Sequence, residues 1–130
     1  MKRRITEKFA TNALLIIFIL VMVFHALVLI GIVPFEMVWG GRLESKEDMI
    51  PFEITSIALN SVMLGIVMMQ AGLLKVNVKP IVLKVAFWCM FLLFAINTVG
   101  NIFSNNELER LIFTPLTLLL AVFSLLLAIK

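Results

Sequence analysis

The chain is a succession of long apolar runs separated by short polar connections. Four runs each reach the length of about 20 residues that a helix needs to cross the hydrocarbon core of a bilayer. They are residues 13–33, 54–74, 81–103 and 111–129. A transmembrane β-barrel would show segments of about ten residues with alternating apolar and polar positions, whereas these runs are continuously apolar. The pattern predicts an all-α transmembrane four-helix bundle, with residues 1–130 as a single integral membrane domain.

The amino-acid composition also indicates that lipid surrounds most of this chain. Of the 130 residues, 62% are hydrophobic and 15% charged, against about 45–50% and about 25% in ordinary soluble domains. Basic residues at positions 2–4 precede the first run, as in a signal peptide. That run is longer than the usual signal core of about 7–15 residues, and no A-x-A-like cleavage site closes it. We expect a retained first helix.

The basic residues predict the orientation. With four spans, one side of the membrane carries both termini and the 75–80 connection. This side holds most of the eleven basic residues of the chain, namely Lys2, Arg3, Arg4, Lys8, Lys75, Lys79, Lys84 and Lys130. The other side holds Arg42, Lys46 and Arg110. Because basic connections stay in the cytoplasm, we expect cytoplasmic N- and C-termini and an outer loop at 34–53.

Several kinds of chemistry are excluded. Cys89 is the single cysteine, so the chain has neither an intramolecular disulfide nor a C-x-x-C redox motif. One histidine and one cysteine do not make a zinc or haem site. Nucleotide-binding, serine-hydrolase and zinc-protease motifs are missing. We therefore expect no metal, no cofactor and no nucleic-acid partner.

Polar residues inside the predicted spans gather in the half nearest the outer loop. Such side chains are costly in hydrocarbon, so their positions are informative. From the helical rise, His25 lies roughly 12 Å, Asn60 roughly 10 Å and Asn97 roughly 9 Å from the outer surface. The candidate ligand-binding residues are His25, Glu53, Ser56, Asn60, Asn97 and Asn101, with Thr98, Thr114 and Thr117 as weaker members. They predict a small polar pocket that opens to the outside.

Helical spacing supports such a pocket. Glu53, Ser56 and Asn60 follow an i, i+3, i+7 pattern, and Asn97 and Asn101 are one turn apart. In a functional interpretation, His25 and Glu53 form an acid/base or proton-binding pair, because an imidazole changes charge near neutral pH, and the asparagines orient a ligand.

In a structural interpretation, the amides form hydrogen bonds between helices, worth about 0.6–2 kcal/mol each. Glu53 is then a solvated residue in the first turn of its helix, where the helix dipole favours a carboxylate. The sequence leaves both interpretations open.

The outer loop is the other unusual segment. Its Gly40-Gly41 pair permits a tight turn, and its apolar residues make it amphipathic enough to lie on the mouth of the bundle. One hypothesis makes it a lid over the pocket, with Glu36, Trp39 and Arg42 as lid residues; the other makes it an interfacial loop anchored by Trp39. In the third connection, Asn105 or Asn106 is expected to cap the last helix.

The segments VPFEMVWGGRLESKEDMIPFE and LLFAINTVGNIFSNNELERL resemble a family of small four-helix bacterial membrane proteins. Their distinctive parts are the WGGRL block, Glu53, Asn60 and the NTxGN block at 97–101. The resemblance covers nearly the whole chain. It implies the fold and a location in the bacterial inner, cytoplasmic membrane, and it implies no activity.

Better-known small membrane families fit less well. Small multidrug transporters are similar in length but rely on a glutamate inside the first helix, where this chain has His25. Fluoride channels are similar in size, but their threonine- and serine-rich helix break is missing. Four-span sterol-isomerase-like proteins are similar in layout, with a histidine in the first helix region, an acid opening the second and a pair like Glu109-Arg110 before the fourth. This last similarity is an analogy of fold.

Three functions remain as hypotheses. The first is a protein whose outward pocket binds a lipid, a small amphipathic ligand or a membrane partner. The second is a membrane enzyme, isomerase-like, that uses His25 and Glu53 as base and acid on a lipid-like substrate. The third is an oligomeric proton-coupled transporter, which would need polar residues along the full depth of the membrane. We expect the lipid bilayer, and either a second copy or another membrane protein, as partners.

Overall fold

The structure, a computed structural model, describes residues 2–38 and 41–130. It contains the helices α1 (Lys2–Leu29), α2 (Lys46–Ala71), α3 (Pro80–Ile102) and α4 (Glu107–Ala128), with a short 3-10 helix, η1 (Phe35–Met37), between the first two. The described residues form no strand. Each of the four long helices is long and apolar enough to cross a membrane. The predicted all-α four-helix bundle of a membrane protein is thereby confirmed.

Local signals explain where the helices begin and end. The Ser45 hydroxyl accepts a hydrogen bond from the backbone N–H of Asp48 and caps α2, and the Asn106 side chain caps α4 through the N–H of Glu109. The cap predicted for the last helix is therefore present at Asn106. Pro80 occupies the first turn of α3, where the missing N–H of proline costs nothing.

Two of the differences between the helix ends and the predicted spans change the outer loop. The first span was expected to reach residue 33, but α1 ends at Leu29 and the chain turns through Gly31. The outer loop was expected to extend to residue 53, but the Ser45 cap starts α2 at Lys46. The connection between α1 and α2 is therefore residues 30–45, and Glu53 lies two turns inside α2 instead of at its start.

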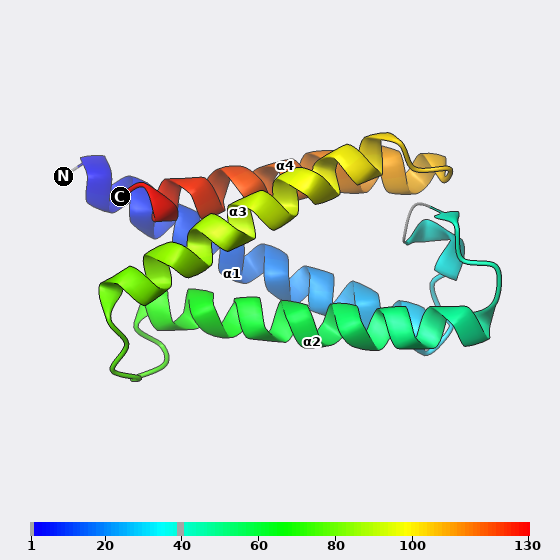
Figure 1. The fold of residues 1–130 in the computed structure, drawn as a ribbon, viewed down its shortest axis with the longest axis horizontal. Helices are drawn as coiled ribbons and strands as arrows, with labels where there is room; N and C mark the ends of the chain where they lie inside the picture. Colours follow the sequence, from blue (N-terminus) through cyan, green and yellow to red (C-terminus); the bar gives the residue numbers. More distant parts are fainter. Residues whose placement is uncertain (1, 39–40) are drawn as a thin grey trace.

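The helices are arranged as two pairs. Helix α1 packs along α2, and α3 packs along α4; α1 also packs on α4, whereas α2 and α3 touch at few places (Figure 1). Both termini and the 72–79 connection lie at one end of the bundle, which we call the terminal end. The 30–45 and 103–106 connections lie at the opposite end, which we call the loop end.

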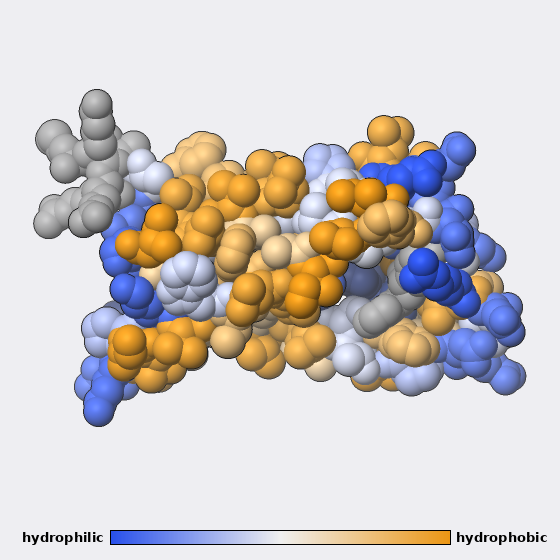
Figure 2. Space-filling view, turned by 45° about the horizontal axis from the view of Figure 1, so that its top comes forward, coloured by the Kyte–Doolittle hydropathy of each residue, from blue (hydrophilic) through white to orange (hydrophobic). Residues whose placement is uncertain are grey.

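The apolar core fills the terminal half of the bundle. Side chains of all four helices meet there, including Leu14, Phe18, Val67, Phe87 and Leu127, each with no exposed surface or almost none. A smaller apolar cluster lies at the loop end. Figure 2 shows a broad hydrophobic band across the molecule with hydrophilic residues at both ends, as expected for a surface in contact with lipid.

Candidate functional site

A cavity of about 460 Å³ lies between the two helix pairs in the loop half of the bundle. All four helices contribute to its lining, together with Val38 and Arg42 from the 30–45 connection. Its size falls within the range of about 300–1,000 Å³ typical of small-molecule sites. Its polar lining residues are His25, Arg42, Ser56, Asn60, Asn97, Asn101, Glu109 and Thr117. The remaining lining is mostly aliphatic and aromatic, so the cavity is amphipathic.

His25 and Glu53 form the most polar contact of the site. Nδ1 of His25 on α1 lies 2.5 Å from Oε2 of Glu53 on α2. The Glu53 side chain has no exposed surface, and the His25 side chain is 16% exposed and lines the cavity. Glu53 is therefore not a solvated residue at the start of its helix, and that alternative is wrong. The pairing of these two residues expected from the sequence is present.

The contact leaves two atoms with spare hydrogen-bonding capacity. Oε1 of Glu53 is buried and has no hydrogen-bond partner among the described residues. A carboxylate that accepts from Nδ1–H selects the imidazole tautomer in which Nε2 carries the lone pair. Because Nε2 lies on the other side of the ring from Glu53 and His25 lines the cavity, Nε2 is the ring nitrogen available to a molecule in the cavity.

Ser56 and Asn60 continue the same face of α2 below Glu53. All three residues are buried, and Ser56 and Asn60 line the cavity, as their helical spacing predicts. Nδ2 of Asn60 donates to the Ser56 carbonyl oxygen at 2.7 Å. This bond lies within one helix, so Asn60 does not join two helices as the structural interpretation expects of the asparagines.

Asn101 does join two helices. Its Nδ2 lies 3.2 Å from the Thr117 hydroxyl and 3.4 Å from the Phe113 carbonyl oxygen, both on α4. Thr98 adds a contact of 3.0 Å to the same Thr117 hydroxyl. For Asn101 the structural interpretation therefore holds, and Thr98 and Thr117 belong to this helix–helix contact.

Asn97 behaves differently from both other asparagines. It is exposed at the edge of the cavity on α3, and its side chain makes no hydrogen bond with the residues that the structure describes. Its place in the lining agrees with the predicted pocket, but no neighbouring helix encloses its side chain. An amide without a protein partner at the depth of hydrocarbon is a group that a ligand would satisfy.

The 30–45 connection reaches across the loop end of the cavity. Val38 is buried and Arg42 contributes to the lining. Nη2 of Arg42 lies 3.5 Å from the carbonyl oxygen of Phe103 at the end of α3. Glu36 is exposed and does not line the cavity, and Trp39 lies outside the described residues. Of the three lid residues expected from the sequence, the structure brings Arg42 to the cavity.

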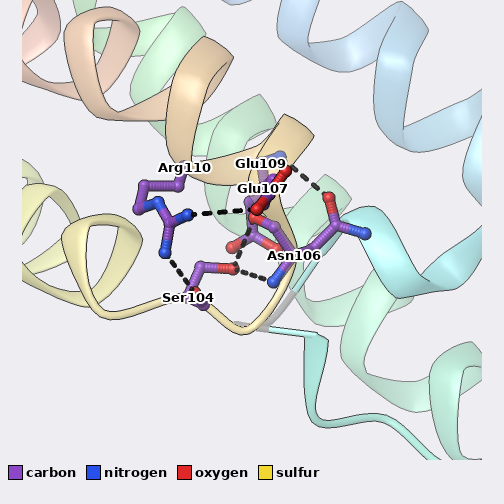
Figure 3. A network of polar contacts seen from close by, with 5 residues as sticks. All are labelled: Ser104, Asn106, Glu107, Glu109 and Arg110. Atoms are coloured by element: carbon purple, nitrogen blue, oxygen red, sulfur yellow. Dashed lines mark hydrogen bonds and ion pairs between the residues drawn. The ribbon is translucent and has the colours of Figure 1, made fainter.

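At Gly41, the 30–45 connection lies directly against the turn between α3 and α4. Gly41 has a φ of 70°, and a Cβ added there would lie 3.1 Å from the backbone nitrogen of Asn106. The turn itself is organised by Ser104, whose hydroxyl accepts from the Asn106 N–H (Figure 3). Arg110 lies 3.5 Å from the Ser104 carbonyl oxygen. These contacts make the turn a defined surface on which the connection rests.

Glu109 is a lining residue that sequence reasoning missed. It was not among the candidate site residues, yet it is only 4% exposed and lines the cavity. The signal was present in its spacing, because Glu109, Phe113 and Thr117 follow one another at four-residue intervals on one face of α4. Within the described residues, no three His, Cys, Asp or Glu side chains gather closely enough to hold a metal ion.

No protein-family model, curated protein or solved structure matches this chain. The resemblance to small four-helix bacterial membrane proteins therefore remains a prediction.

Proposed function

We propose that this protein binds a lipid or another small amphipathic molecule in the cavity between its two helix pairs. The observation that carries the proposal is the mixed lining of a cavity of about 460 Å³ inside a bundle of membrane-spanning helices. The polar part of the ligand would meet the imidazole of His25 and the amides of Asn60 and Asn97. Its apolar part would meet the aromatic and aliphatic lining, as is typical of ligand sites.

Mass spectrometry of the intact protein, gently extracted from its own membrane, tests the proposal. We expect one defined lipid or metabolite to remain bound to the protein. A protein that carries no bound molecule, in particular a ligand-free dimer or larger assembly, would contradict the proposal and direct attention to the interface between copies.

Two amides of the chain offer a matched pair of variants for this measurement. Asn97 lines the cavity, whereas Gln70 lies near the terminal end of α2 and does not. Neither side chain makes a hydrogen bond with the described residues. We expect Asn97→Leu to lower the bound fraction about tenfold, the effect of losing roughly 1.4 kcal/mol, and Gln70→Leu to leave it unchanged. Equal loss in both variants would contradict a ligand at Asn97.

A second candidate function is acid/base chemistry on the bound molecule. The observation that favours it is the His25–Glu53 contact of 2.5 Å. With Nδ1–H donated to Glu53, Nε2 of His25 would accept a proton from the ligand, and Glu53 would stabilise the imidazolium that forms. In that case Glu53→Gln would leave ligand in the cavity and stop its conversion. A bound molecule that is identical before and after prolonged incubation would favour simple binding.

Orientation and location form a further part of the proposal. We propose that the terminal end lies in the cytoplasm, because most basic residues of the chain lie at that end. The cavity then opens in the half of the membrane away from the cytoplasm. A bacterial inner membrane is supported by the resemblance of the WGGRL and NTxGN segments.

A further inference from the structure

The cavity is closed to different degrees on its different sides. Between α1 and α4, the rings of Phe24 and Phe113 lie with their centroids 4.7 Å apart, and both residues line the cavity. Toward the terminal end, the rings of Phe18 and Phe94 lie 5.7 Å apart and belong to the apolar core. These two aromatic contacts form a closed wall and a closed floor.

The side between α2 and α3 has no such contact. These two helices touch at few places. The lining residues that flank the gap are Leu59 on α2, 50% exposed, and Ile96 on α3, 68% exposed. Asn97 and Gly100 extend the same edge of α3 and are exposed as well. The cavity is therefore open sideways, at a height where the flanking surface is in contact with lipid.

We infer that the ligand of this cavity is a lipid that enters from the bilayer between α2 and α3 and has a small uncharged head with a hydroxyl or carbonyl group. This inference rests on the proposed function and names the class of ligand and its route. The apolar edges at Leu59 and Ile96 suit a hydrocarbon chain that remains partly in the bilayer. The polar groups deeper in the cavity suit the head.

Charge selects the kind of head. The cavity is lined by the Glu109 carboxylate and the Arg42 guanidinium, and the Glu53 carboxylate lies directly behind His25. Arg42 is exposed at the loop end, so the buried residues at the cavity include the two carboxylates and neither a lysine nor an arginine. A phosphate-bearing head would meet repulsion at low dielectric. Hydroxyl and carbonyl groups on a ligand match the remaining polar lining, which consists of asparagine amides, the hydroxyls of Ser56 and Thr117, and the His25 imidazole.

The size of the cavity limits how much of the lipid it holds. At about 460 Å³ it lies near the lower end of the range for small-molecule sites, about 300–1,000 Å³. It therefore accommodates a head and the first part of one chain, and the rest of the chain leaves between α2 and α3. A lipid with a single chain fits this arrangement.

Photo-crosslinking of a long-chain alcohol tests the inference. The probe is hexadecanol with a diazirine on the chain close to the hydroxyl group, dissolved in phosphatidylcholine vesicles that contain the protein. We expect crosslinks to residues of α2 and α3 that line the cavity. Hexadecyl phosphate carries the same chain with a charged head, and we expect it to compete less well than unlabelled hexadecanol.

Two glycines provide the matched variants. A Cβ added at Gly100 or at Gly65 would meet no atom within 4 Å, so a side chain at either position begins in open space. Gly100 lines the cavity and Gly65 does not. We expect Gly100→Leu to lower the crosslinking yield at least about tenfold and Gly65→Leu to leave it unchanged. Ile96→Trp narrows the same opening from an exposed position and is expected to act like Gly100→Leu.

Each outcome decides a separate point. Undiminished crosslinking in both Gly100→Leu and Ile96→Trp would overturn entry between α2 and α3. Stronger competition by hexadecyl phosphate would overturn the uncharged head. If a natural lipid remains bound in the mass spectrum but the probe does not label the cavity, the inference fails and the proposed function stands. If neither binds, the proposed function fails as well.

Discussion

Thr117 is the residue at which α3 and α4 exchange side-chain hydrogen bonds. Its hydroxyl receives contacts from Thr98 at 3.0 Å and from Asn101 at 3.2 Å, and it donates to the Phe113 carbonyl oxygen of its own helix. Thr114, one turn away, has a buried hydroxyl with no partner among the described residues. The two threonines therefore lie one turn apart on α4, but only the Thr117 hydroxyl is hydrogen-bonded to described residues.

Thr117→Val should destabilise the bundle by about 0.6–1.7 kcal/mol, the range measured for hydrogen bonds between membrane helices. Thr114→Val should be neutral or slightly stabilising, because the valine replaces an unsatisfied hydroxyl by a group of the same shape. Unfolding of both variants by a denaturing detergent measures the difference. An equal loss of stability in the two variants would contradict a linking role for Thr117.

The buried face of α2 could be predicted residue by residue, and the faces of α3 and α4 could not. Glu53, Ser56 and Asn60 share one helical face by their spacing, and such a polar face in a membrane-spanning helix is expected to point into the bundle. Asn97 and Asn101 are also one turn apart, but α4 covers only Asn101. The sequence does not show which edge of a polar face a neighbouring helix covers. For this reason it could not distinguish Asn101, which α4 covers, from Asn97 at the edge of the cavity, and Glu109 was overlooked.

Helix ends were predictable where a side chain caps them. Asn106 begins α4 as expected, whereas the Ser45 cap was not anticipated and α2 therefore starts earlier than predicted. The lid-like course of the 30–45 connection depends on a tertiary contact, the approach of Gly41 to Asn106. No local pattern encodes a contact between segments so far apart in the chain.

Gly41→Ala should release this connection from the α3–α4 turn. A residue with a Cβ is strained at positive φ by about 1–2 kcal/mol, and the added Cβ would lie only 3.1 Å from the Asn106 nitrogen. We expect trypsin to cleave after Arg42, which is exposed, several times faster than in the unmodified protein, because cleavage follows local opening.

Gly72→Ala is the control for this variant. Gly72 ends α2 with a φ of 79°, so it carries the same conformational cost, but a Cβ there would meet no atom within 4 Å. Cleavage after Arg42 should stay at its original rate in Gly72→Ala. If both variants accelerate it equally, the effect comes from a general loss of stability and not from the contact of Gly41.

The class of fold followed from the four apolar runs alone. Only helices and closed barrels satisfy their backbone hydrogen bonds in lipid, and continuously apolar runs lack the alternation of barrel strands. The order of helix packing did not follow. Lipid is as apolar as the core, so the lipid-facing and the protein-facing sides of a membrane helix are equally apolar. Hydrophobicity therefore does not indicate which helices are neighbours. For that reason, the separation of α2 from α3 could not be predicted from the sequence. The open side of the cavity depends on this separation.

The proposed orientation is testable because Cys89 is the single cysteine of the chain. In a Cys89→Ala background, Glu44→Cys and Lys79→Cys place one thiol at each end of the bundle, both at exposed positions. A membrane-impermeant maleimide added to intact cells should label the protein with Glu44→Cys and should label the one with Lys79→Cys only after permeabilisation. The reverse pattern would invert the proposed orientation.

The uneven distribution of core and cavity along the bundle has a mechanical consequence. The terminal half is filled by packed side chains, whereas the loop half holds a cavity that is open between α2 and α3. A lipid that enters there from the bilayer moves its cross-section from the lipid of one leaflet into the bundle and leaves the other leaflet unchanged. The occupied and the empty protein then differ in the area that they take up in that leaflet. The lateral pressure of the leaflet acts on this difference in area and therefore shifts the equilibrium between the two states.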